Sequence, residues 1–204
     1  MTAGPPRQTI VTLDLEGVLV PEIWIAVAER TGIDALRRTT RDEPDYDALM
    51  RYRLDLLAEH DLTMSLIGEV IAGLDPLPGA EGFLAELRSK RPVVILSDTF
   101  EQFAWALAPK LGHPTILCHR LDVDASDRIT GYRLRMPDQK RAAVEAFHSL
   151  GYRVLAAGDS YNDTSMLLAA DAGYLFHAPP NVVADFPQLE AVDDFERLLS
   201  RLLS

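Results

Sequence analysis

The chain has 204 residues, of which 48% are hydrophobic and 25% charged, and this length suits one α/β core with one sizeable insertion. Its formal charge of −11 argues against a nucleic-acid partner, because proteins that bind nucleic acid usually present a basic patch. No apolar stretch approaches the ~20 residues of a membrane span, and the lone Cys118 suits a reducing compartment, so we expect a cytoplasmic protein without a membrane partner.

The predicted elements begin after a short tail over residues 1–8, which lacks the apolar segment of a signal peptide. An apolar run from Thr9 to Asp14 predicts a buried strand. Residues 16–20 are too short and too interrupted by glycine for a helix, so they predict a turn or flap that leads outward. Pro21 then suits the first turn of a helix that ends at Thr31-Gly32.

No convincing strand occurs between residue 22 and about residue 75. Two further helical stripes lie there, formed by Tyr46, Leu49, Met50, Leu54 and Leu57, and by Leu66, Ile67, Val70 and Ile71. The run from Asp75 to Gly79, which contains two prolines, breaks the helical pattern. We therefore predict a small helical cap over residues 21–75, inserted into an α/β core made by residues 1–20 and 76–204.

Strands and helices alternate along the rest of the chain. Further strands are predicted to end at Ser97 and to cover residues 115–118, 152–157 and 172–176. Helices are predicted over residues 83–87 and 100–111, from Lys140 onward, and over residues 162–170. A β-hairpin is predicted to pair residues 121–124 with residues 129–134. This rhythm predicts a Rossmann-like parallel sheet with right-handed crossovers.

Carboxylate and hydroxyl side chains stand at the ends of three of these strands. They are Asp14 with Glu16, Ser97 with Asp98, and Asp159 with Asp163. Because the carboxyl ends of parallel strands line the ligand crevice of an open α/β sheet, we expect these groups to meet. Two carboxylates about 4 Å apart repel by roughly 4 kcal/mol at an effective dielectric near 20, so the cluster needs a cation. Hard carboxylate oxygens suit Mg²⁺.

Four segments, taken in order, resemble the four motifs of the haloacid dehalogenase-like phosphatases. They are Asp14-Leu15-Glu16-Gly17-Val18, Leu96-Ser97-Asp98-Thr99, Lys140, and Gly158-Asp159-Ser160-Tyr161-Asn162-Asp163. Within this superfamily the chain is most similar to the branch of the phosphoserine phosphatases that is also a homoserine phosphotransferase. Two departures from ordinary phosphoserine phosphatases favour that branch. Glu16 stands where they have a second Asp, and Ser97-Asp98-Thr99 where they have Ser-Gly-Gly.

The resemblance implies a Mg²⁺-dependent enzyme of serine biosynthesis that hydrolyses O-phospho-L-serine through an aspartyl phosphate. Transfer of the phosphoryl group to L-homoserine would be a second activity. Asp14 would be the nucleophile, and Glu16 would protonate the leaving alkoxide and later activate water. The metal would bind Asp14, the backbone carbonyl of Glu16, and Asp159, while Asp163 would act on metal-bound water or on Lys140.

The remaining site residues are expected to bind substrate. Ser97 can donate a hydrogen bond to a phosphoryl oxygen, and Lys140 can neutralise the phosphoryl charge and keep Asp14 ionised. Arg53 lies on the apolar stripe of its helix, where an anion would be its natural partner, and the resemblance makes that anion the substrate carboxylate. The resemblance also assigns the substrate ammonium to Glu22. The further expected contacts of phosphate or substrate are Asp98 and Asn162.

Simpler interpretations exist for most of these residues. Asp14 and Glu16 can end a strand in solvent, and Ser97 and Asp163 can cap helices. Lys140 can be solvated, with neighbouring Arg141 in its place. Arg53 can extend its charge to water, and Glu22 can be stabilised by a helix dipole.

Three other functions are open besides the one that the resemblance implies. They are a phosphatase of another small phosphate ester, a receiver-like phosphoacceptor module, and a catalytically inactive phosphate-binding protein. The helical insertion and Glu16 argue against a receiver. The sequence leaves open the acceptor used in the cell and the oligomeric state.

Overall fold

A mostly parallel sheet forms the centre of the molecule in this computed structural model, which describes residues 7–39, 42–43 and 45–204. Most of the predicted N-terminal tail, residues 1–6, lies outside the described residues. The described part contains seven paired strands in the order β4-β3-β2-β1-β5-β6-β7, and only β3 and β4 pair antiparallel. The strands are β1 (Thr9–Leu13), β2 (Val93–Phe100), β3 (Thr115–Val123), β4 (Ile129–Arg133), β5 (Arg153–Gly158), β6 (Ala172–Phe176) and β7 (Glu190–Val192). The predicted Rossmann-like class is confirmed.

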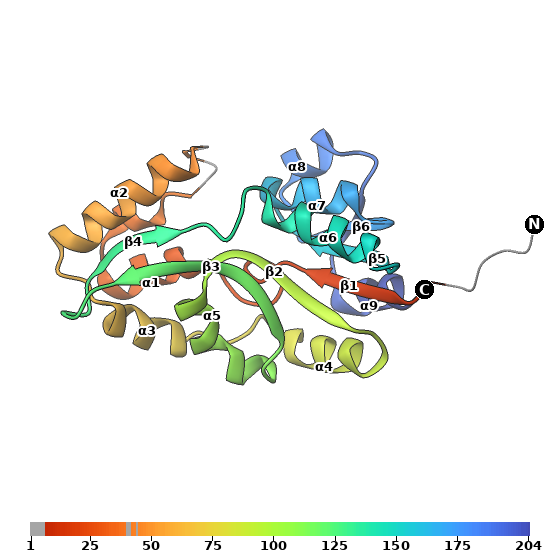
Figure 1. Ribbon diagram of the computed structural model, residues 1–204, viewed down its shortest axis with the longest axis horizontal. Helices are drawn as coiled ribbons and strands as arrows, with labels where there is room; N and C mark the ends of the chain where they lie inside the picture. Colours follow the sequence, from red (N-terminus) through yellow and green to blue (C-terminus); the bar gives the residue numbers. More distant parts are fainter. Residues whose placement is uncertain (1–6, 40–41, 44) are drawn as a thin grey trace, which may run out of the picture.

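Helices cover both faces of the sheet (Figure 1). One face packs against α6 (Gln139–Ser149), α7 (Thr164–Ala169) and α8 (Pro180–Asp185). The other packs against α4 (Ala80–Lys90), α5 (Glu101–Leu107) and α9 (Phe195–Leu203). Successive strand residues point to opposite faces, so Ile10 belongs to the first apolar layer and Val11 to the second. Short 3₁₀ turns at Ala108–Leu111 and Tyr161–Asp163 complete this part of the chain.

The insertion between β1 and α4 contains no strand among its described residues, as the sequence predicts. Its helices are α1 (Ile23–Thr31), a 3₁₀ turn (Asp34–Arg37), α2 (Tyr46–Glu59) and α3 (Met64–Ala72). None of the described helices has the length and apolar character to cross a membrane. Whether residues 21–75 form a domain of their own stays a prediction.

The loop after β1 turns back into the protein, so the expectation of an outward flap is wrong. Gly17 N–H donates to the Val20 carbonyl at 2.9 Å, and Val18, Leu19 and Val20 are fully buried. These apolar side chains fill the core, which holds the loop inward. Leu77 N–H donates to the Leu19 carbonyl at 2.9 Å, so the two ends of the insertion are joined.

The start of α1 also differs from the sequence prediction. The helix begins at Ile23, two residues after Pro21, and Glu22 makes no capping hydrogen bond with its side chain. Instead, the Glu16 carboxylate accepts a hydrogen bond from the Ile23 N–H at 2.9 Å. A carboxylate seven residues upstream therefore satisfies one of the free N–H groups at the helix start.

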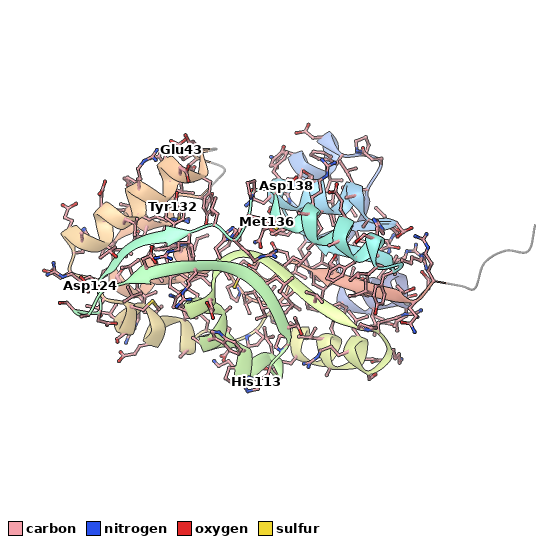
Figure 2. All side chains as sticks on the ribbon, in the orientation of Figure 1. Glu43, His113, Asp124, Tyr132, Met136 and Asp138 are labelled. Carbon is pink, nitrogen blue, oxygen red and sulfur yellow. The ribbon has the colours of Figure 1, made fainter. Side chains whose placement is uncertain are left out.

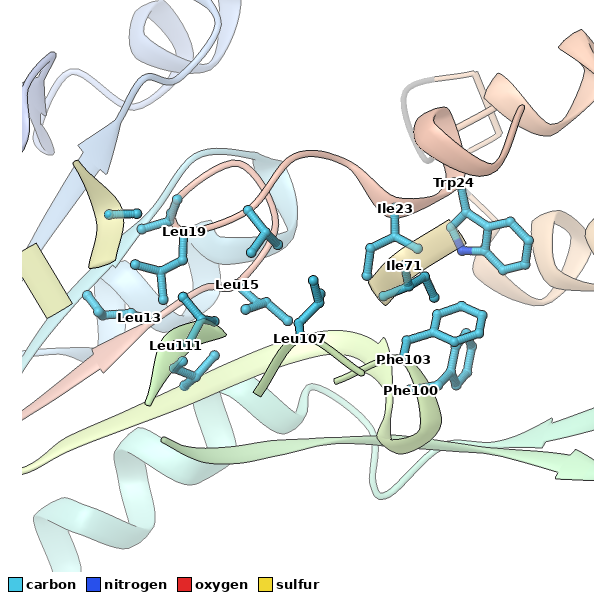
Figure 3. Close-up of a cluster of buried hydrophobic side chains, with 14 of the residues drawn as sticks. Leu13, Leu15, Leu19, Ile23, Trp24, Ile71, Phe100, Phe103, Leu107 and Leu111 are labelled. Atoms are coloured by element: carbon cyan, nitrogen blue, oxygen red, sulfur yellow. The ribbon is translucent and has the colours of Figure 1, made fainter. Parts of the chain in front are cut away.

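One apolar cluster joins the insertion to the sheet. It runs from Leu13 beneath the sheet to Ile23 and Trp24 at the start of α1, and on to Ile71 of α3 (Figure 3). The rings of Trp24 and Phe103 meet edge to face, with their centroids 5.7 Å apart. The insertion thus packs on the same apolar layer as α4, α5 and α9.

The predicted strand 115–118 and the first arm of the predicted hairpin are one continuous strand, β3. Buried His119 and Leu121 alternate with exposed Arg120, and this pattern keeps the strand extended. The hairpin of β3 and β4 reaches beneath the helices of the insertion. There the Tyr132 hydroxyl donates to Asp47 of α2, and Asp127 accepts from the Ser65 N–H of α3 at 2.9 Å. Tyr132 lies close to α2 in Figure 2.

Candidate active site

The strand register explains why the polar strand ends meet. Leu13 at the end of β1 lies opposite Ile95 of β2 on one side and Ala157 of β5 on the other. The next residue, Asp14, donates its N–H to the Ala157 carbonyl at 3.0 Å. Because the chain crosses to opposite sides of β1 from β2 and β5, this edge is the topological switch point at which α/β sheets bind ligands.

A cavity of about 560 Å³ opens at this edge. Its lining includes every site residue predicted from the sequence except Asp163, which is fully buried behind it. The lining residues are Asp14, Glu16, Glu22, Trp24, Thr39, Tyr46, Arg53, Ser97, Asp98, Thr99, Lys140, Asp159, Ser160, Tyr161, Asn162 and Asn181. The insertion, the sheet and helix α8 thus all contribute to one space.

Lys140 lies at the centre of the charged groups. Its Nζ is 2.8 Å from Asp163 Oδ1, 3.0 Å from Asp14 Oδ1 and 3.5 Å from Asp98 Oδ2. Burial opposes its charge, yet the neighbouring carboxylates, Asp14 foremost, raise the pKa of Lys140 above its ordinary value. The structure therefore places Lys140 in the site, whereas Arg141 is exposed and pairs with Glu145.

Negative charge exceeds positive charge around Lys140. Oxygens of Asp14, Asp159 and Asp163 lie within 4.8 Å of one another, and Asp98 adds a fourth carboxylate against this one ammonium. Burial and the charge of Asp163 raise the pKa of Asp14 well above its ordinary value, although Lys140 acts against both. A buried cluster of this kind is stabilised by a cation, and an all-oxygen donor set fits Mg²⁺.

Asp163 already uses both of its carboxylate oxygens within the protein. Oδ1 accepts from Lys140, and Oδ2 accepts the N–H groups of Asp159 at 3.0 Å and Ser160 at 3.1 Å. These contacts match the expected role of Asp163 behind the metal ligands more closely than direct ligation. A Cβ on Gly158 would come within 2.3 Å of Asp163 Cγ, so this close approach requires glycine.

Glu16 points toward the insertion. Its carboxylate accepts the Ile23 N–H, and the Thr99 hydroxyl donates to it. Burial, with the charge of Glu22, raises the pKa of Glu16 to about 7. The following residue, Gly17, has φ +76°, and a Cβ there would lie 2.4 Å from Asp159 Cγ. The loop after β1 therefore packs its backbone directly against the Asp159 carboxylate.

Ser97 is buried at the edge of the sheet and caps no helix. Its Oγ accepts the Thr99 N–H at 3.2 Å, and β2 continues to Phe100, three residues beyond the predicted end. Asp98 is partly exposed in the cavity wall. Burial opposes its ionisation, but Lys140 and other donors hold the pKa of Asp98 below its ordinary value.

Arg53 is buried in the helical wall of the cavity, with 7% of its surface exposed. One guanidinium nitrogen donates to the Arg38 carbonyl at 2.9 Å, and the group stacks 4.5 Å from the centre of the Trp24 ring. Its Nε has no hydrogen-bond partner among the described residues. Burial lowers the pKa of Arg53 to about 10. The interpretation of a side chain that extends to water is wrong.

Several cavity residues were missed by the sequence analysis. Thr99 and Gln139 directly follow predicted residues or precede them, but their side chains carry no signal of their own. Asn181 belongs to α8, beyond the last of the four segments, and nothing in the sequence marks it. Gln139 is buried beside Ser97 and Asp98 and donates to both.

The sequence model of the haloacid dehalogenase-like hydrolases matches residues 9–171. The chain belongs to this family. The matched segment runs from β1 to the start of β6 and includes both walls of the cavity apart from Asn181.

Curated relatives and solved structures agree with this assignment. Phosphoserine phosphatase ThrH of Pseudomonas aeruginosa is 61% identical over 194 residues, which cover 95% of each chain. A phosphoserine phosphatase of Pseudomonas syringae is 60% identical over 93% of this chain and 80% of the relative. A substrate-bound phosphoserine phosphatase structure superimposes with a TM-score of 0.80 at 19% identity, over 98% of this chain and 100% of that one. At that identity the superposition shows the fold alone.

Proposed function

We propose that this protein is a Mg²⁺-dependent phosphatase that hydrolyses O-phospho-L-serine and also transfers the phosphoryl group to L-homoserine. The observation that carries the proposal is the pairing of two groups across one cavity. A strand-end carboxylate, Asp14, lies on one wall, and a buried arginine, Arg53, lies on the other. The names of the two Pseudomonas relatives support phosphoserine as the substrate.

The sheet wall supplies the phosphoryl chemistry. Asp14 attacks phosphorus, the serine alkoxide leaves, and an aspartyl phosphate forms. Lys140, 3.0 Å from Asp14 Oδ1, keeps this carboxylate ionised and balances the charge of the phosphoryl oxygens. The Ser97 hydroxyl donates to one of those oxygens.

Glu16 acts as the acid and then as the base. It protonates the leaving alkoxide and then takes a proton from water, or from the hydroxyl of homoserine, as that oxygen attacks the aspartyl phosphate. Its contacts with the Ile23 N–H and the Thr99 hydroxyl fix the carboxyl group within the cavity.

The metal site uses oxygens of the sheet wall. Asp14, Asp159 and the backbone carbonyl of Glu16 would hold Mg²⁺, with Asp163 behind them. The ion supplies positive charge beside the phosphoryl group. Fixing of Asp159 by the Gly17 backbone, and of Asp163 by three donors, supports a preformed site.

The helices of residues 21–75 form the cap that recognises the organic part of the substrate. Arg53 binds the carboxylate, for which its Nε offers an unused donor among the described contacts, and Glu22 binds the ammonium. Asn162 and Asp98 contribute from the opposite wall. A phosphatase of another small ester would have less use for a buried guanidinium in this position.

The test compares two substrates on Arg53→Ala, with Arg51→Ala, an exposed arginine of the same helix, as the matched control. Loss of a desolvated charged contact typically costs ~2–5 kcal/mol, so kcat/KM for phosphoserine should fall by roughly 10²-fold or more. Activity on p-nitrophenyl phosphate, which lacks the amino-acid group, should change little. An equal loss on both esters would make Arg53 structural and reduce the proposal to a generic phosphatase.

A further inference from the structure

Asp98 is held in the cavity wall by donors that the four motifs do not contain. Gln139 Nε2 lies 3.1 Å from Asp98 Oδ1, and His119 Nε2 lies 3.5 Å from the same oxygen. The other oxygen, Oδ2, is 3.5 Å from Lys140 Nζ. Gln139 and His119 are both buried, with 2% and 5% of their surfaces exposed. The position of Asp98 therefore depends on how these two side chains present their hydrogens.

Arg135 fixes the orientation of both donors. Its backbone N–H donates to His119 Nδ1 at 3.1 Å, so that nitrogen carries no proton and the neutral ring carries its proton on Nε2, facing Asp98. Its guanidinium donates twice to Gln139 Oε1, from Nε at 3.1 Å and from Nη2 at 3.0 Å. The amide nitrogen of Gln139 must then face Asp98 and the Ser97 carbonyl. Both donors are set by one residue.

Arg135 itself is outside the cavity. It lies in the segment that joins β4 to α6, next to Met136 in Figure 2, and its side chain is exposed. It belongs to none of the four motifs and does not line the space above Asp14. Any effect of this residue on the reaction must pass through the side chains that it orients.

We infer that Arg135 is a positioning residue that acts through Gln139 on Asp98, and so keeps Lys140 beside Asp14. Without its guanidinium, the Gln139 amide can turn and present its oxygen to Asp98. Asp98 would then compete harder for the Lys140 ammonium, which Asp14 and the phosphoryl group also need. The inference rests on the proposed phosphoryl transfer but not on the identity of the organic group.

The test is the rate of phosphoryl transfer in Arg135→Met, with Arg133→Met as the matched control. Arg133 is an exposed arginine two residues away that pairs with Asp122. Small misplacements of catalytic groups cost up to ~10²-fold, and we expect a fall of about 10-fold in kcat for both phosphoserine and p-nitrophenyl phosphate. KM for phosphoserine should change little, and Arg135→Lys, which keeps one donor to Gln139, should recover part of the rate. A rate in Arg135→Met equal to that of the control would overturn the inference.

A double-mutant cycle shows whether the effect passes through Asp98. In an Asp98→Asn background, Arg135→Met should cost little more, because the carboxylate to be positioned is gone. A further 10-fold loss in that background would mean that Arg135 acts by another route, and the inference would fail. If Arg135→Met does not fold, Gln139→Glu replaces it, since this variant keeps the contact with Arg135 but has no N–H for Asp98.

The outcome is separate from that of the proposed substrate. If phosphoserine is not hydrolysed but p-nitrophenyl phosphate is, the same cycle on the latter ester still decides the role of Arg135.

Discussion

The two walls of the cavity differ in how completely their charged groups are paired. On the sheet wall, Lys140 contacts three carboxylates and Asp163 accepts from three protein groups. On the helical wall, Arg53 has one backbone acceptor and an Nε without a partner among the described residues. The sheet wall is thus organised before any ligand arrives, whereas the helical wall retains hydrogen-bonding capacity for the ligand. The first arrangement suits chemistry that is the same for every phosphate ester, and the second suits recognition of one of them.

The strongest disruption of the sheet wall is Asp14→Asn. An amide is a poor nucleophile, so turnover should fall to less than about a hundredth of wild type, as befits a loss larger than the ~10²–10⁴-fold typical of general acid–base help. The same change removes one negative charge from a crowded buried cluster, so the thermal unfolding temperature should not fall. Steady-state assays and thermal unfolding check both points. Turnover above a hundredth of wild type would remove Asp14 from the role of nucleophile.

A smaller effect on the same wall is expected from Gly17→Ala. The new Cβ would meet Asp159 Cγ at 2.4 Å, and alanine is strained at φ +76°. Displacement of a residue that supports a metal ligand typically costs 10–100-fold in metal affinity, so the Mg²⁺ concentration for half-maximal activity should rise by about that factor.

Gly32→Ala is the control for Gly17→Ala, because φ there is +72° but no atom lies within 4 Å of the new Cβ. A normal Mg²⁺ requirement in Gly17→Ala would show that Asp159 is not a ligand held by this loop.

The smallest effect concerns the stability of the helical wall. Replacing a buried charge by an apolar side chain of similar size is often neutral or stabilising, so Arg53→Met should change the free energy of unfolding by less than about 1 kcal/mol. Arg51→Met is the exposed control on the same helix. Denaturant titration measures the difference. A loss of about 3 kcal/mol or more would show that Arg53 is held mainly for folding, and the contrast between the walls would disappear.

The sequence allowed prediction of the groups that follow strands. Asp14, Ser97 and Asp159 could be brought together from their order alone, because parallel strands deliver their carboxyl ends to one edge. Lys140 needed the family resemblance, since a lone lysine has no distinguishing pattern. Arg53 was noticed as a charged residue on an apolar stripe.

What the sequence did not reveal depends on contacts between distant segments. The role of Arg135 follows from the path of the chain between β4 and α6, and no periodicity records that path. The start of α1 was misplaced because its N–H partner, Glu16, lies in another element. Leu66 was assigned to the buried stripe of its helix but is 39% exposed, because the helix turns Ile67 and Ile71 inward instead.

The hairpin of β3 and β4 has a consequence for how such enzymes can diversify. By sequence it belongs to the core, yet its tip supports the start of α3 through Asp127, and Tyr132 bonds α2. Buried Ile129 sits in the apolar cluster shared with the insertion. A cap grafted from a relative by exchanging residues 21–75 alone would meet a platform shaped for a different set of helices. Exchange of substrate specificity between relatives therefore requires two separate segments of the chain to change together.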